Sequence, residues 1–156
     1  MCARAGRMKT KLLISACLLG TPCRYDGKSK PCAAVSDLER YFEFIPVCPE
    51  IDGGLPTPRP PAEIKDGRVY NSLGDDVTAE YLCGAEKAVR TARDNGCVYA
   101  LLKARSPSCG NKQVYDGSFC NRLTDGRGIT ADALIKNGVD VFSEDEIDLL
   151  LSHIKL

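Results

Sequence analysis

Four short apolar runs alternate in this sequence with segments that carry helical signals, and this alternation restricts the fold more than any other feature. The runs have the length of buried strands; they comprise residues 11–18, 43–48, 97–103 and 139–142. Helical signals are found at residues 35–42, 77–95, 131–137 and 143–153. Strands separated by helices usually pair in parallel, because each helix returns the chain to the edge where the previous strand began. The sequence therefore predicts an α/β fold, a single compact Rossmann-like domain with a mostly parallel sheet and flanking helices.

Turn and capping residues refine this prediction. Asp66 and Gly67 predict a two-residue hairpin turn. Gly96 lies where the longest helix would end, and Ser143 with Glu146 forms a capping box before the last one. Apolar residues at helical spacing are expected to form the buried face of the longest helix: Leu82, Ala85, Ala88, Val89 and Ala92. Two stretches are expected to be loops, residues 49–61 and 104–117.

The chain has 156 residues, the size of one domain, and shows no internal repeat or linker. We expect residues 1–10 to be a flexible leader and residues 11–156 to form the domain. The basic start and the apolar run before Cys17 imitate a bacterial lipoprotein signal, but that run is shorter than the roughly 7–15 residues of a signal sequence. No stretch approaches the roughly 20 apolar residues that cross a membrane.

Nine cysteines and a single histidine restrict the chemistry of the chain. An odd number of cysteines cannot all pair, and a domain of this size does not need disulfides to fold. We therefore expect free thiols in a reducing compartment, the cytoplasm. A metal site must be built mostly from thiolates, as in an iron–sulfur cluster or an all-cysteine zinc site. Lys plus Arg equals Asp plus Glu, at 21 each, so nucleic-acid binding is possible but not favoured.

Three cysteines follow three of the expected strands. Cys17 lies at the end of the first strand, Cys48 at the end of the second, and Cys109 in the loop after the third. The carboxyl ends of parallel strands lie along one edge of a sheet, where open α/β folds bind their ligands. The three thiols are therefore expected to converge and to hold an iron–sulfur cluster. Three ligands rather than four would leave one iron open, which is typical of a catalytic centre.

The remaining cysteines have a simpler interpretation. Free cysteine is among the most buried residue types, and packing alone explains most of these positions. This interpretation applies to Cys2, Cys32, Cys83, Cys97 and Cys120. Cys23 remains open, because it lies in a polar loop close to Cys17 and could be a fourth ligand or a structural thiol.

Polar residues near these cysteines are candidates for proton transfer and substrate binding. Glu50, two residues after Cys48, could act as general acid or base, although it could equally be a solvated loop carboxylate. Ser106 and Ser108 share a loop with Cys109 and could donate hydrogen bonds to a substrate. Two cations precede them and could either receive an anion or form a solvated rim: Lys103 and Arg105.

Four long segments resemble a known family: ISACLLGTPCRYDGKSK, VCPEIDGGLPTPRPPAEI, LLKARSPSCGNKQVYDGSF and GITADALIKNGVDVFSEDEI. From about residue 11 onward the chain resembles the bacterial thiouracil desulfurase (desulfidase) family, long known only as a domain of unknown function. The resemblance implies an oxygen-sensitive 4Fe-4S cluster on three cysteines and conversion of the thiocarbonyl of 2- or 4-thiouracil to a carbonyl, with release of hydrogen sulfide. By motif position it assigns the cluster ligands to Cys17, Cys48 and Cys109. It assigns the acid/base group to Glu50 and the active-site serine to Ser106.

Two alternatives to this function remain. The substrate could be a thiolated nucleoside or tRNA base instead of a free thiolated pyrimidine. The chain could also be a metal sensor or a structural four-thiolate metal protein, with Cys23 completing the site. The sequence carries no signal for the oligomeric state.

Overall fold

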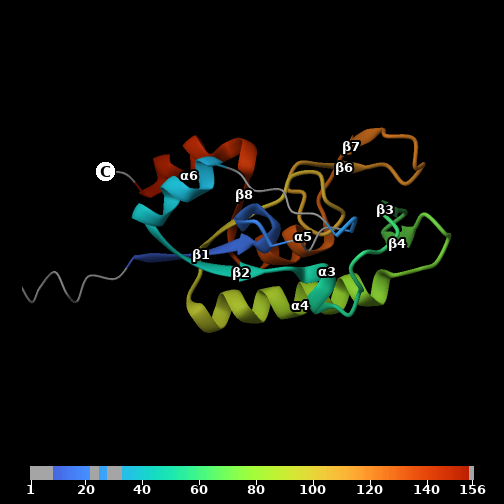
Figure 1. Ribbon diagram of the computed structural model, residues 1–156, viewed down its shortest axis with the longest axis horizontal. Coiled ribbons are helices and arrows are strands. Elements are labelled where there is room, and N and C mark those ends of the chain that lie inside the picture. The colour runs from blue at the N-terminus through green and yellow to red at the C-terminus, as the bar shows by residue number, and fades with distance from the viewer. Residues whose placement is uncertain (1–8, 22–24, 28–32, 155–156) are drawn as a thin grey trace, which may run out of the picture.

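A four-stranded parallel sheet forms the centre of the computed structural model, which describes residues 9–21, 25–27 and 33–154 (Figure 1). The strands are β1 (Thr10–Ser15), β2 (Phe42–Val47), β5 (Tyr99–Leu102) and β8 (Asp140–Ser143). Their order in the sheet is β2-β1-β5-β8, and every neighbouring pair is parallel. The predicted α/β fold with a parallel sheet is confirmed.

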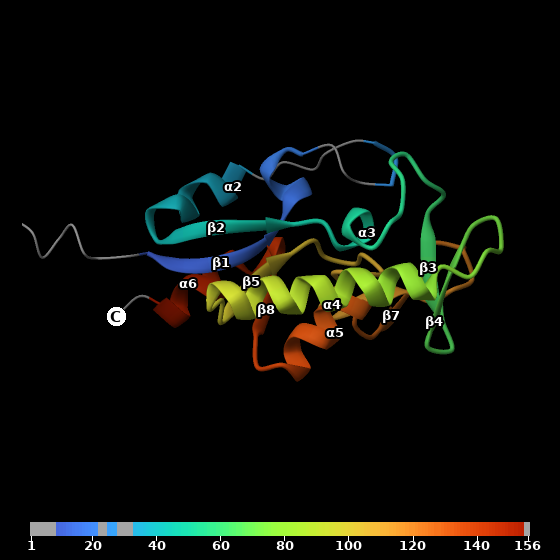
Figure 2. The same cartoon turned by 90° about the horizontal axis from the view of Figure 1, so that it is seen from below.

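Helices cover both faces of this sheet (Figures 1 and 2). On one face lie α4 (Thr78–Asn95) and α5 (Ile129–Lys136); on the other lie α2 (Ala33–Ser36), the 3-10 helix η2 (Asp37–Arg40) and α6 (Ile147–Ile154). A further 3-10 turn, η3 (Glu144–Glu146), joins β8 to α6. The molecule therefore has the three layers expected of a Rossmann-like domain.

Successive residues of β1 enter two separate cores. Leu12 and Ile14 pack with Leu38 and Leu150 on the α6 side, whereas Leu13 packs against α4 and α5. Side chains alternate between the faces of a strand, so a strand covered on both sides must be apolar at every position. This requirement explains the continuous apolar run in β1, where all three side chains are fully buried.

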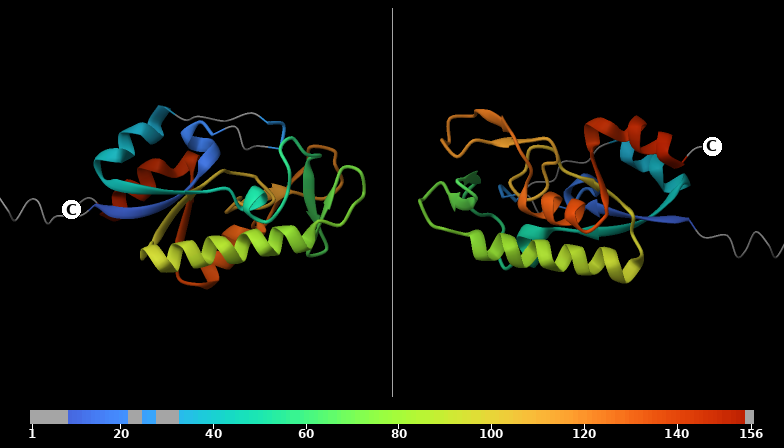
Figure 3. Two further views of the ribbon diagram at one scale, coloured as in Figure 1. Left: turned by 60° about the horizontal axis from the view of Figure 1, so that its bottom comes forward. Right: turned by 180° about the vertical axis from the view of Figure 1, so that it is seen from behind.

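Two antiparallel hairpins extend the fold beyond the carboxyl ends of the sheet strands. They are formed by β3 (Ala62–Lys65) with β4 (Arg68–Asn71), and by β6 (Gln113–Tyr115) with β7 (Leu123–Asp125). Figure 3 shows both hairpins at the same end of the molecule. The Glu63 carboxylate joins them, because it accepts the backbone N–H groups of Gly117 and Phe119.

Several local predictions are confirmed. Asp66 and Gly67 form the hairpin turn with φ angles of 51° and 79°. Gly96 ends α4 in the left-handed conformation, with a φ angle of 66°. Ser143 and Glu146 form the capping box.

The first predicted strand, residues 11–18, is too long at its carboxyl end. β1 ends at Ser15, and the 3-10 turn η1 (Ala16–Leu19) follows it and contains Cys17. Gly20 closes this turn with a φ angle of 101°, which a residue with a side chain rarely adopts. The apolar run continues through the turn because Leu18 also enters the core.

Both predicted loops contain a short element. The loop at residues 49–61 begins with the one-turn helix α3 (Pro49–Asp52), and the loop at residues 104–117 includes β6. Each element is too short to produce a periodic pattern. The start of α3 is nevertheless marked by Pro49 at its first position and Glu50 in its first turn.

The described part of the chain begins inside the expected leader. Residues 1–8 lie outside the description, and Thr10 already pairs with Phe42 in the sheet. None of the described helices has both the length and the apolar character needed to cross a membrane.

Candidate metal centre

The three cysteines expected to hold a metal all lie at the carboxyl edge of the sheet. Cys17 lies in η1 directly after β1, Cys48 immediately precedes α3 at the end of β2, and Cys109 lies in the loop after β5. β1 lies between β2 and β5, so the chain segments that carry the cysteines leave the sheet side by side. They leave it where the strand order reverses, the usual ligand-binding position in such folds.

Electrostatic interactions link the three thiols. The pKa of Cys17 is raised to about 12, first by burial and then by the proximity of Cys109 and Cys48. Burial also raises the pKa of Cys109 to about 12, with further increases from Glu50 and Cys48. The thiolate forms therefore repel one another in a setting with little water. A positively charged metal group between them would relieve that repulsion.

The backbone around Cys17 is held by a tight turn. The N–H of Gly20 donates to the carbonyl oxygen of Cys17, and that of Thr21 donates to the carbonyl oxygen of Ala16, both at 3.2 Å. These bonds fix the direction in which the chain leaves β1, and with it the position of the thiol.

Cys48 is positioned by very close packing of α3 on α4. A methyl group on Gly84 would lie 1.9 Å from the carbonyl oxygen of Pro49, and one on Gly53 would lie 2.0 Å from that of Glu80. Only glycine allows two backbones to approach this closely. The two glycines therefore set the distance between α4 and the segment that carries Cys48 and Glu50.

The loop that carries Cys109 is fixed from within and from α5. The Ser106 Oγ accepts the N–H groups of Ser108 and Cys109, both at 3.1 Å. At the first turn of α5, the N–H of Gly128 donates to Gly110 at 2.7 Å and that of Thr130 donates to Ser108 at 2.8 Å. The position of Cys109 is therefore determined by backbone contacts with α5.

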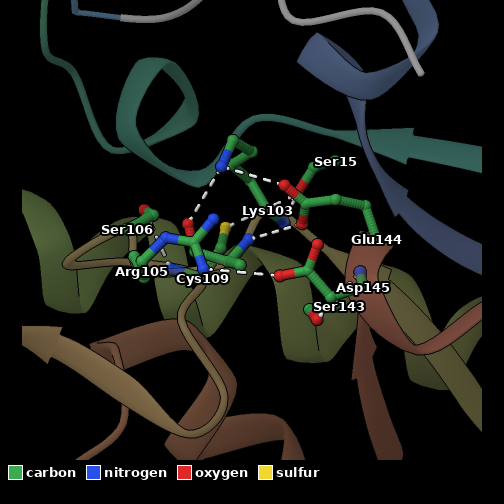
Figure 4. A network of polar contacts seen from close by, with 9 residues as sticks. Ser15, Lys103, Arg105, Ser106, Cys109, Ser143, Glu144 and Asp145 are labelled. Carbon is green, nitrogen blue, oxygen red and sulfur yellow. Dashed lines mark hydrogen bonds and ion pairs between the residues drawn. The ribbon is translucent and has the colours of Figure 1, made fainter.

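Ser15 connects β1 to the Cys109 loop. Its hydroxyl donates to the Sγ of Cys109 at 3.6 Å and accepts the backbone N–H of Lys103 at 3.0 Å (Figure 4). Ser15 is the last residue of β1 and is buried. A hydrogen bond to the cysteine sulfur favours its thiolate form.

The side chain of Glu50 is largely shielded from water, with 18% of it exposed. Its Oε1 accepts the hydroxyl of Tyr81 at 2.7 Å and the Nε of Arg59 at 3.2 Å. The Nη1 of Arg59 donates to the carbonyl oxygen of Pro56 and the hydroxyl of Thr57, both at 3.0 Å. Burial and the nearby Glu50 raise the pKa of Tyr81, so this phenol remains a donor. The interpretation of Glu50 as a solvated loop carboxylate is therefore wrong.

The two cations before the cysteine loop have different surroundings (Figure 4). Lys103 forms a shielded ion pair with Glu144, with Nζ and Oε2 2.9 Å apart. Arg105 pairs with Asp145 at 3.3 Å, and both of these side chains are exposed. Only Arg105 thus forms the solvated rim that the sequence offered as one interpretation of both cations.

A cavity of about 490 Å³ lies beside this network. It is lined by Ala104, Arg105, Asn111, Lys112, Gln113, Asp125, Ser143, Asp145 and Glu146. Its polar lining carries charges of both signs, and Ala104 with Arg105 connects it to the chain that leads to Cys109.

The donor set matches an iron–sulfur cluster. Cys17 and Cys109 are buried, Cys48 is half-buried, and all three follow neighbouring strands at one edge of the sheet. In a cluster each cysteine binds a different iron, which spaces the sulfurs widely. A single zinc ion needs sulfurs within roughly 4 Å of one another. Within residues 9–21, 25–27 and 33–154, no three His, Cys, Asp or Glu side chains form a group that could hold one metal ion. Cys23, the open candidate for a fourth ligand, lies outside the described residues.

The other cysteines agree only in part with their simple interpretation. None of the six described cysteines is in a disulfide. Cys97 is buried as expected, but Cys83 and Cys120 are exposed. Cys83 lies on the solvent side of α4, opposite the residues that pack on the sheet. Cys2 and Cys32 lie outside the described residues.

Sequence reasoning missed the residues that hold Glu50 and Lys103. The expected buried face of α4 is confirmed at Ala85, Ala88, Val89 and Ala92 and is wrong at Leu82. Leu82 is 55% exposed, whereas Tyr81 is buried and reaches Glu50. A helical pattern starting at Tyr81 would have indicated a buried phenol. Arg59 and Glu144 have no comparable signal in the sequence.

Comparisons with known proteins agree with this geometry. A family model described as 2-thiouracil desulfurase matches residues 12–146. The chain is 35% identical over 150 residues to the uncharacterized protein YbbK of Bacillus subtilis (strain 168), an alignment that covers 90% of this chain and 99% of YbbK. It also resembles the solved structure of the 4Fe-4S-dependent thiouracil desulfidase TudS, with a TM-score of 0.88 and 44% identity. That match covers 94% of this chain and 98% of the solved one.

Proposed function

The chain belongs to the 2-thiouracil desulfurase family, and we propose that it is an iron–sulfur-dependent desulfidase, which converts the thiocarbonyl of thiouracil to a carbonyl and releases hydrogen sulfide. The observation that carries this proposal is the likeness to a 4Fe-4S-dependent thiouracil desulfidase over nearly the whole chain. The substrate is then a small thiolated pyrimidine. The free thiols suit work in the cytoplasm.

Cys17, Cys48 and Cys109 would hold a 4Fe-4S cluster through three ligands and leave one iron open. This assignment is supported by their convergence at the carboxyl edge and by the electrostatic coupling of Cys17 and Cys109 with Cys48. When bound, the cluster supplies a Lewis acid with affinity for the soft sulfur of a thiocarbonyl.

Glu50 is the group that would handle the proton. In the overall reaction, the thiocarbonyl and water give a carbonyl and hydrogen sulfide, with no change in oxidation state. The attacking water must lose a proton, and a carboxylate within reach can accept it. Tyr81 and Arg59 both bond Oε1, so Oε2 is the oxygen left for this transfer.

Ser106 would orient the substrate or the water. Its oxygen already accepts two backbone N–H groups, and among the described residues its hydroxyl hydrogen has no acceptor. That hydrogen can therefore be donated to an oxygen or nitrogen of the pyrimidine. The same serine would both shape the Cys109 loop and contact the substrate.

Anaerobic turnover tests the proposed function. Protein prepared without oxygen should convert 2- or 4-thiouracil to uracil and release an equimolar amount of sulfide, measured by chromatography and a sulfide assay. Cluster-containing protein that acts on thiolated nucleosides or tRNA but not on the free bases would move the substrate to that class. Cluster-containing protein inactive on all of them would contradict the enzyme assignment and favour a sensor.

A further inference from the structure

Lys103 and Glu144 form an ion pair shielded from water at the carboxyl ends of β5 and β8. Their side chains are only 17% and 12% exposed. The Lys103 Nζ also donates to the carbonyl oxygen of Ala104 at 3.1 Å, and the Glu144 Oε1 accepts the Ala104 N–H at 2.7 Å. Both charges are thus anchored to one backbone position, and neither can turn away without losing several bonds.

This ion pair borders the cysteine site. The backbone N–H of Lys103 donates to Ser15, whose hydroxyl donates to Cys109 (Figure 4). Lys103 directly follows β5, at the carboxyl edge where the three cysteine-bearing segments leave the sheet. The two charges of the ion pair have opposite signs, so they act in opposite directions on a charged group bound there.

Other cations around the site are engaged elsewhere. Arg59 is bonded to Glu50 and to the loop before it. The side chain of Arg105 is 42% exposed and pairs with the exposed Asp145, so water and salt weaken its effect on the site. Arg59 is even less exposed than Lys103, but its charge is committed to the carboxylate of Glu50. Lys103 is the shielded cation that adjoins Ser15 and, through Ser15, Cys109.

A cluster on three thiolates carries net negative charge, because the thiolates outweigh the charge of the oxidised iron–sulfur core. We propose that Lys103 is the counter-charge of the loaded cluster and that Glu144 positions it and limits its effect. This inference rests on the proposed function, since it requires the cluster. It assigns both residues as positioning residues of the site.

The opposite signs of the two charges give a specific expectation. Reduction adds negative charge to the cluster, and a nearby cation favours reduction. Lys103→Met should therefore move the reduction potential to a more negative value. Glu144→Gln, which keeps the shape but removes the opposing anion, should move it to a more positive value. The reduction potential of Lys103→Arg should stay close to that of the protein without substitutions.

A redox titration of anaerobically prepared holoprotein, followed by electron paramagnetic resonance, measures these shifts. A second readout is the rate at which an iron chelator removes the cluster. This rate should rise on the order of tenfold in Lys103→Met. Arg90→Met is the matched control, because it removes the cation of an exposed ion pair on α4. It should leave both readouts unchanged.

The outcomes separate this inference from the proposed function. If the protein without substitutions holds no cluster, the proposed function is overturned, and this inference with it. A cluster whose potential moves in the same direction in Lys103→Met and Glu144→Gln would indicate a purely structural role and overturn the inference alone. Shifts of the potential no larger than that of Arg90→Met would also overturn the inference. If Lys103→Met does not fold, Glu144→Gln still decides the question, because only the proposed role predicts that its potential becomes more positive.

Discussion

Glu50 has one oxygen occupied by donors and one available for chemistry. The hydroxyl of Tyr81 and the Nε of Arg59 both reach Oε1. Two donors on one oxygen prevent the carboxylate from rotating, so Oε2 keeps a fixed direction. A general base needs such fixed geometry before its acidity matters.

Replacement of Glu50 by Gln tests this role at the scale of one residue. The amide keeps the shape but cannot accept the proton that water loses, so turnover of thiouracil should fall by about 10²–10⁴-fold. The cluster should remain, because Glu50 is not among the proposed ligands. Anaerobic turnover is measured together with cluster absorbance.

The matched control is Glu86→Gln, the same substitution at an exposed carboxylate on α4. It should retain near-normal turnover. Full activity in a cluster-containing Glu50→Gln variant would remove Glu50 from the mechanism. The proton would then have to pass through Ser106, Ser108 or solvent.

At the scale of elements, the contact between α3 and α4 positions both a ligand and the base. α3 has a single turn and carries Glu50, with Cys48 directly before it. So short a helix has little stability of its own. Its position depends on the close contact with α4 at Gly53 and Gly84.

Gly84→Ala should displace this short helix. At an ordinary interior helix position, alanine stabilises relative to glycine by about 1 kcal/mol. Here the new methyl group overlaps the carbonyl oxygen of Pro49, so α3 must move and Cys48 with it. We expect most of the cluster iron to be lost although α4 persists, as measured by iron per chain and circular dichroism. Cys83→Ala, at the exposed neighbouring position, should keep its iron; equal iron in both variants would contradict the account.

Elements with strong local signals could be predicted from the sequence, and those set by packing could not. The Asp66-Gly67 hairpin and the Gly96 end of α4 follow from backbone conformations that few residues adopt. The burial of the sheet between two cores follows from the continuous apolar runs of its strands. By contrast, α3 and β6 are too short for any period, and their place depends on contacts with distant segments.

At the scale of the whole molecule, the parallel sheet brings three distant cysteines to one edge. Strand–helix alternation predicted this edge, and the order β2-β1-β5-β8 places the three cysteine-bearing connections next to one another. The family resemblance from sequence motifs is confirmed by the family match and by the solved desulfidase. The placement of the three cysteines at this edge could therefore be predicted from chain order and topology.

The supporting residues of the site could not be predicted in the same way. Arg59, Tyr81 and Glu144 reach the centre from a loop, a helix and a 3-10 turn. Their roles depend on the packing of connections, which no local pattern encodes. Sequence reasoning therefore gave the candidate ligands but not the residues that hold Glu50 and Lys103 in place.

The central claim is that three cysteines hold a 4Fe-4S cluster, and metal analysis of cysteine variants tests it most directly. Unchanged protein purified without oxygen should contain about four irons and four sulfides per chain. Cys17→Ser, Cys48→Ser and Cys109→Ser should each lose them, whereas Cys83→Ser, at an exposed position, should not. Zinc in place of iron in an iron-replete preparation would contradict the claim. Loss of the cluster in Cys23→Ser would also contradict it, because a fourth cysteine ligand would leave no open iron.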